Sequence, residues 1–464
     1  MAEVNVSPPM VEELADWAYS RSWRDLSAQA RSALKERVLD AVGCAVGAMS
    51  TEPMQAIHKL TADVGGSPMA TLLGGGRTAP DRAAFFNGAA IRYLDFNDSY
   101  LAKGETCHPS DNVAPVLAAA EFAGASGREF LAALAIAYQV QCRLSDVAPV
   151  RSRGFDHTVQ GAYAAAIGAA RAMGLNAAQM AHAAAIAGTS YNSLRVTRTG
   201  ELSNWKGLAY PNTAMGGVHA ALLAKYGITG PREVFEGNKG FMDTMAGHFS
   251  IDWSKEGLEK VTETITKRYN AEIHAQSAIE GLLELKDSTG LQAKDIERIR
   301  LTTFDVAFHI IGGGEEGDKK SVRKKEEADH SLPYMMAVAF LDGQLLPQQY
   351  LPERILRADV QELLQKVYVS PAKAYSDLFP DAMACNIEIE TVDGRRFHRE
   401  KRDYQGFQTR PATWGQIVDK YQILTRNIDP AISQQIVDVV EHLEQVQVTD
   451  LTALLGQIRS KEGE

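Results

Sequence analysis

The chain has 464 residues, of which 45% are hydrophobic and 23% charged, and its formal net charge is -10. This length exceeds what a single core usually supports, so we expect two domains. The acidic balance disfavours a nucleic-acid partner, whose phosphates need a basic surface, but it allows a small anionic substrate in a locally positive pocket.

The first part of the chain, to about residue 260, has a helical pattern that is rich in alanine. Ser27 is a candidate N-cap for a helix with apolar residues four positions apart. Residues 112–144 predict a helical hairpin that turns at 124–127, and Asn176 is a candidate cap for a further helix. Because alanine covers all faces of these helices, we expect a packed helical centre rather than a surface layer.

The pattern changes near Thr264. β-Branched residues in partial alternation predict strands in residues 263–269 and 297–308. Residues 386–400 predict a hairpin that turns at Asp393-Gly394. Helical patterns lie between these strands, at 274–290 and 331–343.

From about Thr413 the helical pattern returns. The simplest layout is a mainly α protein with an all-helical domain built from both chain ends, residues 1–266 and 408–464. An α+β domain, residues 267–407, is inserted between them. We find no internal repeat, which disfavours an α-solenoid.

The cysteines are few and widely spaced, which disfavours a disulfide framework, a zinc ribbon and an iron–sulfur cluster: Cys44, Cys107, Cys142 and Cys385. The N-terminal stretch lacks the basic-then-apolar plan of a signal peptide, and no apolar run is long enough to cross a bilayer. We therefore expect a cytoplasmic protein without membrane contact.

Titratable residues are concentrated in residues 93–112, between two apolar helical patterns. If the preceding helix runs through Tyr93, Arg92, Asp95 and Ser99 share one face. Pro109 favours an extended His108, and Ser110 or Asp111 is a candidate cap for the next helix. His108 would then lie near a helix N-terminus, which favours anions. This combination suits proton transfer on a carboxylate-bearing molecule.

Two other interpretations of this stretch remain open. It also fits a solvated loop followed by a well-capped helix. A metal site of Asp95, Asp98 and His108 is a further alternative, although their spacing matches no standard ligand pattern.

Five segments, in order along nearly the whole chain, resemble the MmgE/PrpD family: "LDAVGCAVGA", "FFNGAAIRYLDFND", "HPSDNVAPVLAAAE", "KRYNAEIHAQSAIEGLLEL" and "ADHSLPYMMAVAFLDG". The resemblance implies a metal-free, cofactor-free enzyme that acts on small di- or tricarboxylates. It also implies a helical domain from both chain ends, an α+β lid and a homodimer. Asp111 and Glu272 are more similar to the 2-methylcitrate dehydratase branch than to the cis-aconitate decarboxylase branch.

The resemblance also implies the residues of the site. His108 is the first candidate for proton transfer, because the unperturbed pKa of histidine lies near neutral pH. Asp95 would orient His108, and His157 and His274 are further acid–base candidates. The expected substrate-binding residues are Ser99, Lys206 and Lys267. Apart from the resemblance, Arg151 is a candidate carboxylate-binding residue because it lies just before His157. No metal ligand is expected.

Other features have simpler explanations. His182 and His219, inside alanine-rich helices, are expected to be core residues. Ser331 and Pro333 explain the stretch around His330 as a helix start. Residues 312–328 are expected to form a charged surface loop without a nucleotide site.

The expected function is a hydro-lyase that dehydrates 2-methylcitrate to 2-methyl-cis-aconitate in propionate breakdown, with side activity on citrate or cis-aconitate. The alternatives are a cis-aconitate decarboxylase or an amino-dicarboxylate epimerase of the same family, and a helical carboxylate-binding protein without turnover. Product analysis distinguishes the enzymes, and unchanged substrate would indicate the binding protein.

Overall fold

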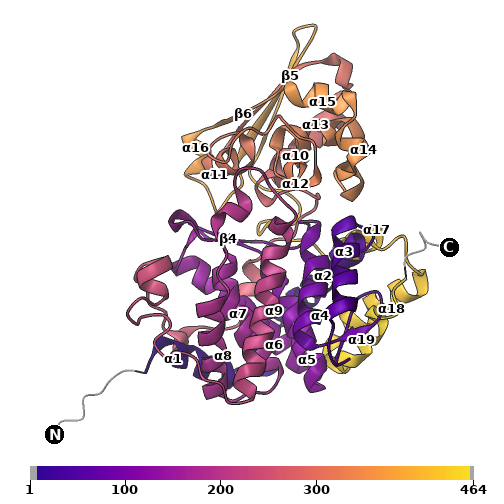
Figure 1. Ribbon diagram of the computed structural model, residues 1–464. Helices are drawn as coiled ribbons and strands as arrows, with labels where there is room; N and C mark the ends of the chain where they lie inside the picture. Colours follow the sequence, from indigo (N-terminus) through magenta and orange to yellow (C-terminus); the bar gives the residue numbers. More distant parts are fainter. Residues whose placement is uncertain (1–7, 460–464) are drawn as a thin grey trace.

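The computed structural model describes residues 8–459, so residues 1–7 and 460–464 of the predicted helical domain lie outside the described residues. Two bodies are stacked on each other (Figure 1). The larger one is helical, and the smaller one carries the main sheet. The expectation of a mainly α fold with a small sheet region is confirmed.

The helices of the larger body come from both ends of the chain. The N-terminal part contributes α1 (Met10–Ser20), α2 (Ala28–Ala48), α3 (Glu52–Val64), α4 (Pro80–Tyr93), α5 (Val113–Ala123), α6 (Gly127–Val147), α7 (Thr158–Ala172), α8 (Ala177–Ser190) and α9 (Trp205–Lys225). The C-terminal part contributes α17 (Trp414–Leu424), α18 (Pro430–Glu441) and α19 (Val448–Leu455).

Local sequence signals set several of these boundaries, as predicted. The Ser27 hydroxyl accepts a hydrogen bond from the Ala30 N–H at 3.0 Å and caps α2. The Asn176 side chain accepts one from the Gln179 N–H at 3.0 Å and caps α8. The hairpin of α5 and α6 turns at Gly124, whose φ of 65° suits glycine.

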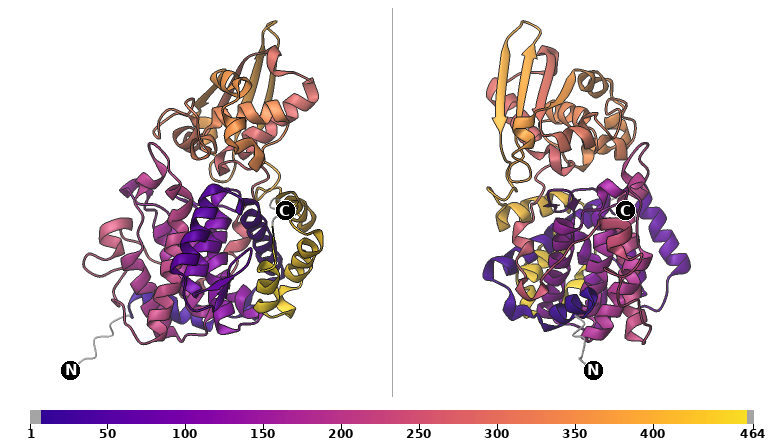
Figure 2. Two further views of the ribbon diagram at one scale, coloured as in Figure 1. Left: turned by 45° about the vertical axis from the view of Figure 1, so that its right-hand side comes forward. Right: turned by 90° about the vertical axis from the view of Figure 1, so that its left-hand side faces the viewer.

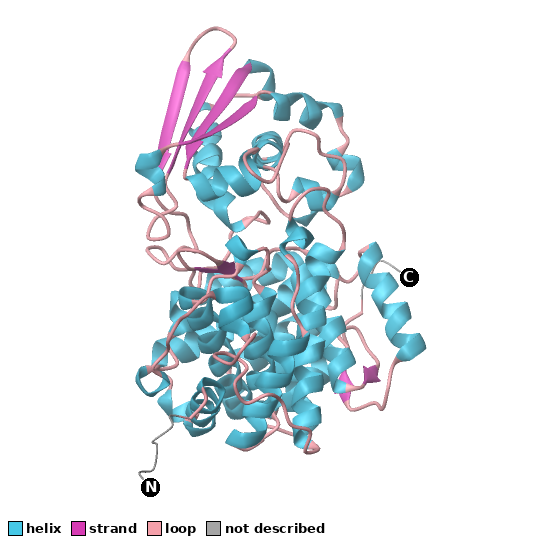
Figure 3. Ribbon diagram, turned by 60° about the vertical axis from the view of Figure 1, so that its left-hand side comes forward, coloured by secondary structure: helices cyan, strands magenta, loops and turns pink. Residues whose placement is uncertain are grey.

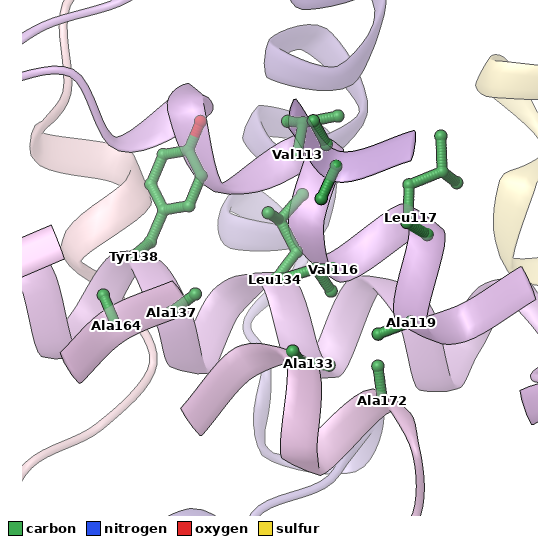
Figure 4. Packing of buried hydrophobic residues seen from close by; sticks show 14 of the residues in the cluster. Val113, Val116, Leu117, Ala119, Ala133, Leu134, Ala137, Tyr138, Ala164 and Ala172 are labelled. Carbon is green, nitrogen blue, oxygen red and sulfur yellow. The ribbon is translucent and has the colours of Figure 1, made fainter. Parts of the chain in front are cut away.

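Small side chains let the central helices approach closely. Alanines and short aliphatic residues of α5, α6 and α7 face one another in the core (Figure 4). Gly217 of α9 lies so near α7 that an added Cβ would be 2.9 Å from the backbone nitrogen of Ala166. The alanine-rich sequence is therefore a requirement of packing, and the prediction of a buried helical centre is confirmed.

The C-terminal helices return to the beginning of the chain. In both views of Figure 2 they lie beside the N-terminal helices. The Lys420 ammonium of α17 pairs with Asp40 of α2 at 2.6 Å, and apolar residues of α17 to α19 belong to the same core as α2.

The smaller body contains a four-stranded sheet with the order β6-β5-β7-β8. The strands are β5 (Ile296–Thr303), β6 (Val367–Pro371), β7 (Cys385–Thr391) and β8 (Arg396–Lys401). β5 and β6 are parallel, whereas the other pairs are antiparallel. The sheet lies at one side of this body (Figure 3). Its hairpin turns at Asp393-Gly394 as predicted, with a φ of 82° at Gly394.

Helices cover one face of the sheet, as the alternating burial along β7 requires. The principal ones are α10 (Gln276–Thr289), α13 (Leu332–Asp342) and α15 (Ala358–Gln365). Four short helices complete this body: α11 (Asp305–Ala307), α12 (Lys325–Ala328), α14 (Pro352–Ile355) and α16 (Lys373–Ser376).

Two strand predictions need correction. Residues 263–269 form no strand, because Ile265 makes only an isolated bridge, to Ser99 of the helical body. The strand predicted at 297–308 ends at Thr303, and the chain then turns into α11 and a π-helical turn at Phe308–Gly312. The first segment contacts the helical body instead of a sheet, and the second leaves the sheet after Thr303.

Two hydrophobic cores correspond to the two bodies. One includes buried residues from Val11 to Val261 and from Ile417 to Ile458, and the other runs from Ala271 to Ile389. We propose that the domains are residues 1–266 with 408–464, the helical domain, and 267–407, the lid domain. The chain crosses between them twice, near residues 266 and 408.

Candidate active site

A small polar cavity lies where the helical domain meets the lid domain. It is lined almost wholly by charged and polar side chains: Arg92, Asp95, Glu105, Thr106, His108, Arg151, His157, Arg195, Arg198, Glu272, His274, Ile310, Glu316 and His330. Its volume is about 40 Å³, whereas sites for small organic molecules usually have about 300 Å³ or more. The walls must therefore separate before such a molecule can enter.

The structure brings all eight predicted site residues together. Five of them line the cavity: Asp95, His108, Arg151, His157 and His274. The other three contact those residues from behind: Ser99 contacts His108, and Lys206 and Lys267 contact Asp95.

Asp95 lies just beyond the end of α4, in a left-handed backbone conformation with a φ of 54°. The predicted pair of Arg92 and Asp95 is present, with 2.8 Å between the guanidinium and the carboxylate. The prediction that Ser99 continues the same helical face is wrong, because the helix ends at Tyr93 and Ser99 instead bridges to Ile265.

Asp95 is held by cations on several sides. Its Oδ1 accepts hydrogen bonds from Arg92 Nη1 at 2.8 Å and from Lys267 Nζ at 2.6 Å. Lys267 also donates to the Asp95 carbonyl at 2.6 Å, and Lys206 Nζ is 3.6 Å from Oδ2. Burial alone would raise the pKa of Asp95, but these cations hold it well below its usual range.

Lys206 connects Asp95 to a second carboxylate. Its Nζ donates to Asp329 Oδ1 at 2.5 Å and lies 2.8 Å from His330 Nδ1. Lys325 pairs with the other oxygen of Asp329 at 2.7 Å. Burial lowers the pKa of Lys206 to about 8, against the opposing effect of the two carboxylates. We call Arg92, Asp95, Lys206, Lys267, Lys325 and Asp329 the inner cluster.

A group of possible metal ligands lies at the inner cluster. Oxygen and nitrogen atoms of Asp95, Asp329 and His330 lie within 4.8 Å of one another and could together bind an ion. The Lys206 ammonium, however, already contacts Asp329 and His330 at hydrogen-bonding distance. The Lys206 ammonium thus contacts two of the atoms that would otherwise serve as metal ligands.

His108 has a defined tautomer. Its Nδ1 lies 2.9 Å from the Asp98 carbonyl oxygen, which can only accept, so Nδ1 carries the proton. The Ser99 hydroxyl lies 3.1 Å from the same nitrogen. Burial lowers the pKa of His108 well below its usual range. The ring is therefore neutral at neutral pH, with Nε2 as a proton acceptor.

His157 precedes α7 as predicted and meets the His108 ring edge to face, with ring centroids 5.4 Å apart. Its Nδ1 is 3.2 Å from Asp156 Oδ1. Burial lowers the pKa of His157 to about 3. Its Nε2 is buried and has no hydrogen-bond partner among the described residues.

His274 supplies the lid side of the cavity. Its Nδ1 lies 2.8 Å from Glu272 Oε1, and its Nε2 is buried without a hydrogen-bond partner in the described part of the chain. Burial opposes ionisation of Glu272, but His274 lowers the pKa of this carboxyl to about 2. The carboxylate thereby fixes the orientation of the ring. Phe304 and Phe379 pack against it.

At the other end of the cavity, two arginines of the helical domain meet a lid carboxylate. Glu316 Oε1 accepts hydrogen bonds from Arg195 Nη2 at 2.6 Å and from Arg151 Nη2 at 3.2 Å. Arg195 is also 3.7 Å from Asp156. We call Arg151, Arg195 and Glu316 the outer cluster.

The capping prediction for the helix after His108 is wrong. A short 3-10 helix, Pro109–Asn112, precedes α5, and no side chain caps α5 itself. Ser110 and Asp111 instead both accept hydrogen bonds from Asn97, at 2.9 and 2.8 Å. Burial raises the pKa of Asp111 to about 7.

Several residues of this site were not expected from the sequence. His330 is buried and lines the cavity, although its motif was explained as a helix start. Glu316 lies in the segment expected to be a surface loop, and the "GGGEEG" run around it gave no sign of a buried carboxylate. Conversely, the His219 side chain is half exposed and pairs with Asp81, so the expectation of a core residue is wrong.

Lys267 and His274 do not lie on the strands of the lid domain. Lys267 lies in the irregular crossing segment, and His274 lies in a 3-10 helix at Ile273–Ala275. Lys267 is nonetheless fully buried, because the crossing segment runs directly past Asp95.

No helix in residues 8–459 is both long enough and apolar enough to cross a membrane.

The chain is similar to known proteins along its length. It is 29% identical to the 2-methylcitrate dehydratase of Salmonella typhimurium, an alignment that covers 97% of this chain and 98% of the relative. It is 30% identical to the 2-methylcitrate dehydratase of Escherichia coli K12, over 80% and 81% of the two chains. It is 25% identical to the cis-aconitate decarboxylase of mouse, over 91% and 88%.

Family models match both halves of the chain. The MmgE/PrpD N-terminal domain matches residues 12–254, and the MmgE/PrpD C-terminal domain matches residues 269–445. The two matches are in the family's order, and the stretch between them, residues 255–268, includes the place where the chain passes from the helical body to the body with the sheet. The chain therefore belongs to the MmgE/PrpD family.

Proposed function

We propose that this protein is a metal-independent hydro-lyase that dehydrates 2-methylcitrate to 2-methyl-cis-aconitate. The observation that carries the proposal is the neutral His108 ring, whose Nε2 is left as a proton acceptor beside the cationic inner cluster. The relatives named 2-methylcitrate dehydratase support the choice of substrate. Arrangement and relatives together favour lyase chemistry on a tricarboxylate.

The first step is removal of a proton from the carbon next to a carboxylate. His108 Nε2 takes this proton, and the electrons of the C–H bond move towards the carboxylate as an enolate-like charge. Asp98 and Ser99 orient the ring through Nδ1. We assign the role of base to His108 because its protonated Nδ1 leaves Nε2 free to accept.

The second step is loss of the neighbouring hydroxyl group. The electrons return to form the carbon–carbon double bond as the C–O bond breaks, and the hydroxyl leaves as water with one added proton. We assign this proton to His274 Nε2. Because Nδ1 of the same ring donates to Glu272, the step requires that both ring nitrogens carry a proton beforehand, with the Glu272 carboxylate balancing the charge. His157, whose pKa is lowered to about 3, is a poorer proton donor at neutral pH and contributes to positioning.

The carboxylates and the developing charge require cations. In the inner cluster, the four cations Arg92, Lys206, Lys267 and Lys325 are paired with the carboxylates of Asp95 and Asp329. Asp111, 3.7 Å from Arg92, has a pKa raised to about 7 and neutralises them only in part. The inner cluster therefore keeps a net positive charge, which the binding of a trianionic substrate requires. Arg151 would bind a carboxylate at the opposite end.

A metal is not needed in this scheme. Lys206 occupies the position between Asp329 and His330 where an ion would otherwise be bound, and the ammonium and guanidinium groups supply the charge stabilisation. Treatment with a chelator is therefore expected to leave turnover unchanged.

The test is product analysis by proton NMR. Chelator-treated protein is incubated separately with 2-methylcitrate, citrate and cis-aconitate. A new vinylic methyl signal from 2-methylcitrate supports the proposal. Itaconate from cis-aconitate, with 2-methylcitrate unchanged, would assign decarboxylase activity to the chain. The use of Asp111 and Glu272 to favour the dehydratase branch would then be wrong. Three unchanged substrates would favour a binding protein.

The proposal includes a cellular location, an oligomeric state and a pathway. We infer a cytoplasmic homodimer that acts in propionate breakdown. Light scattering of the purified protein tests the dimer, and growth of a deletion strain on propionate tests the pathway.

A further inference from the structure

The outer cluster contains an unsatisfied carboxylate. Both arginines donate to the same oxygen of Glu316, Oε1, at 3.2 Å from Arg151 and 2.6 Å from Arg195. The second oxygen, Oε2, is buried and has no hydrogen-bond partner in residues 8–459. A buried polar atom without a partner is costly, so this contact is weaker than a bidentate pair of arginine and carboxylate.

Arg195 keeps a carboxylate partner without Glu316, and the Arg151 backbone keeps its position. The Arg195 guanidinium also lies 3.7 Å from Asp156, which Arg198 holds at 2.6 Å. The Arg151 backbone N–H donates to Glu105 at 3.2 Å. If Glu316 were to withdraw, a pair of arginines would be left that could receive another carboxylate.

The outer cluster is also the more accessible end of the cavity. The side chains of Arg151 and Arg195 are 24% and 16% exposed, whereas those of Lys206 and Lys267 are 4% and 0% exposed. A molecule that enters from solvent meets the arginines first.

Glu316 is attached to the lid in a way that allows it to move. It lies between Gly313 and Gly317, whose φ angles of 103° and 91° suit glycine. Its backbone N–H donates to the His309 carbonyl at 3.0 Å, and within residues 8–459 the hydrogen bonds to its carboxylate come from Arg151 and Arg195 of the other domain. Rotation of the side chain or a shift of the lid would release both arginines together.

We propose that Arg195, with Arg151, forms a carboxylate-binding subsite, and that Glu316 occupies this subsite in place of a substrate carboxylate until substrate arrives. The inference rests on the proposed carboxylate substrate and adds two residues to the site, Arg195 and Glu316. On entry, a substrate carboxylate replaces Glu316 and pairs both of its own oxygens with the arginines. The same exchange enlarges the cavity, whose present volume is about 40 Å³.

The test is a comparison of two variants, Arg195→Gln and Glu316→Gln. The probe is tricarballylate, which has three carboxylates but no hydroxyl group to lose, and its Kd is measured by titration calorimetry. Arg195→Gln removes a charged donor and is expected to weaken binding about tenfold or more. Glu316→Gln removes an internal competitor and is expected to tighten binding, by about threefold to tenfold.

The opposite signs separate this proposal from a structural ion pair, for which both variants would weaken binding. Weaker binding by Glu316→Gln would therefore overturn it, as would an unchanged Kd for Arg195→Gln. Arg195→Lys keeps the charge but loses the two-pronged donor, so it is expected to lie between wild type and Arg195→Gln. Circular dichroism verifies that each variant is folded.

A matched control is available in the lid sheet. Arg300 pairs with Glu388 at 2.5 Å, away from the cavity, and Arg300→Gln is expected to leave the Kd unchanged. If wild-type protein does not bind tricarballylate at all, the proposed substrate class fails together with this inference. If wild-type protein binds and both variants of the outer cluster weaken binding, only the inference fails.

Discussion

The two ends of the candidate site are built from the same kinds of side chain but differ in how their central carboxylates, Asp95 and Glu316, are paired. In the inner cluster, the oxygens of Asp95 contact three cations, and these cations are almost fully buried. In the outer cluster, one oxygen of Glu316 accepts hydrogen bonds from two partly exposed arginines, and the other oxygen has no hydrogen-bond partner within residues 8–459.

This difference assigns different tasks to the two ends. Charges that are fixed by several partners stay in place during a reaction and can stabilise charge without rearrangement. A contact that is poorly satisfied can be exchanged for a substrate group. We infer that the inner cluster supports the chemistry and that the outer cluster admits the substrate. The predictions below test this contrast.

The largest effect is expected at His108. His108→Ala removes the base and should lower kcat by about a hundredfold to ten-thousandfold, with an unchanged circular dichroism spectrum. His219→Ala is the matched control, because that ring lies on an exposed helix surface beside Asp81. Near-normal turnover of folded His108→Ala would remove this residue from the mechanism.

The next effect concerns stability. Asp95→Asn leaves Lys267 and Arg92, both buried, without their shared carboxylate, and should cost about 3–5 kcal/mol in the free energy of unfolding. Glu316→Gln should cost less than about 1 kcal/mol, since its arginines are partly exposed. Urea unfolding measures both values. Equal costs would contradict the distinction between the two ends.

The inner cluster also predicts a pH dependence. Because the pKa of Lys206 is lowered to about 8, its ammonium is lost as the pH rises above 8. kcat/KM should then fall on the alkaline side, and Lys206→Arg, which stays charged, should move that decline to higher pH. The profiles are recorded from pH 6 to 10. The same decline in both proteins would assign it to another group.

A smaller effect is expected at Asp111, whose pKa is raised from 3.8 to about 7 by burial. A raised folded-state pKa contributes stability that is complete below about pH 4 and is lost as the pH rises through 7. Asp111→Asn is neutral throughout, so its stability relative to wild type should rise by about 1 kcal/mol or more between pH 4 and pH 7. Melting temperatures across this range measure the difference, and a constant difference would argue against a raised pKa.

Much of the fold could be predicted from local sequence signals. Ser27 and Asn176 mark helix starts by side-chain caps, and Asp393-Gly394 marks a hairpin by its backbone preference. The strand predicted at residues 263–269 was wrong because β-branched residues also suit an extended segment between domains. Only tertiary structure decides whether such a segment pairs with a sheet.

The site could be predicted only in part. The family resemblance indicated seven of the eight residues that the structure brings together around the cavity, and Arg151 was chosen because it lies just before His157. Glu316 and Arg195 gave no signal, because Glu316 lies in a polar loop and Arg195 in a short 3-10 helix, and their contact depends on how the lid domain packs on the helical domain. His330 was not expected in the site because a helix start explained its neighbours. Its ring nevertheless contacts Lys206, which lies 124 residues away in the sequence.

The most direct test of the contrast between the two ends is a crystal structure with bound tricarballylate. The account predicts one carboxylate between Arg151 and Arg195, Glu316 turned away from them, and a ligand carbon facing His108 Nε2. The pairs of Asp95 with Arg92 and Lys267 should be unchanged. A ligand that leaves Glu316 on the arginines, or that binds in the separate cavity of about 570 Å³ beside Arg268 and Lys420, would contradict the account.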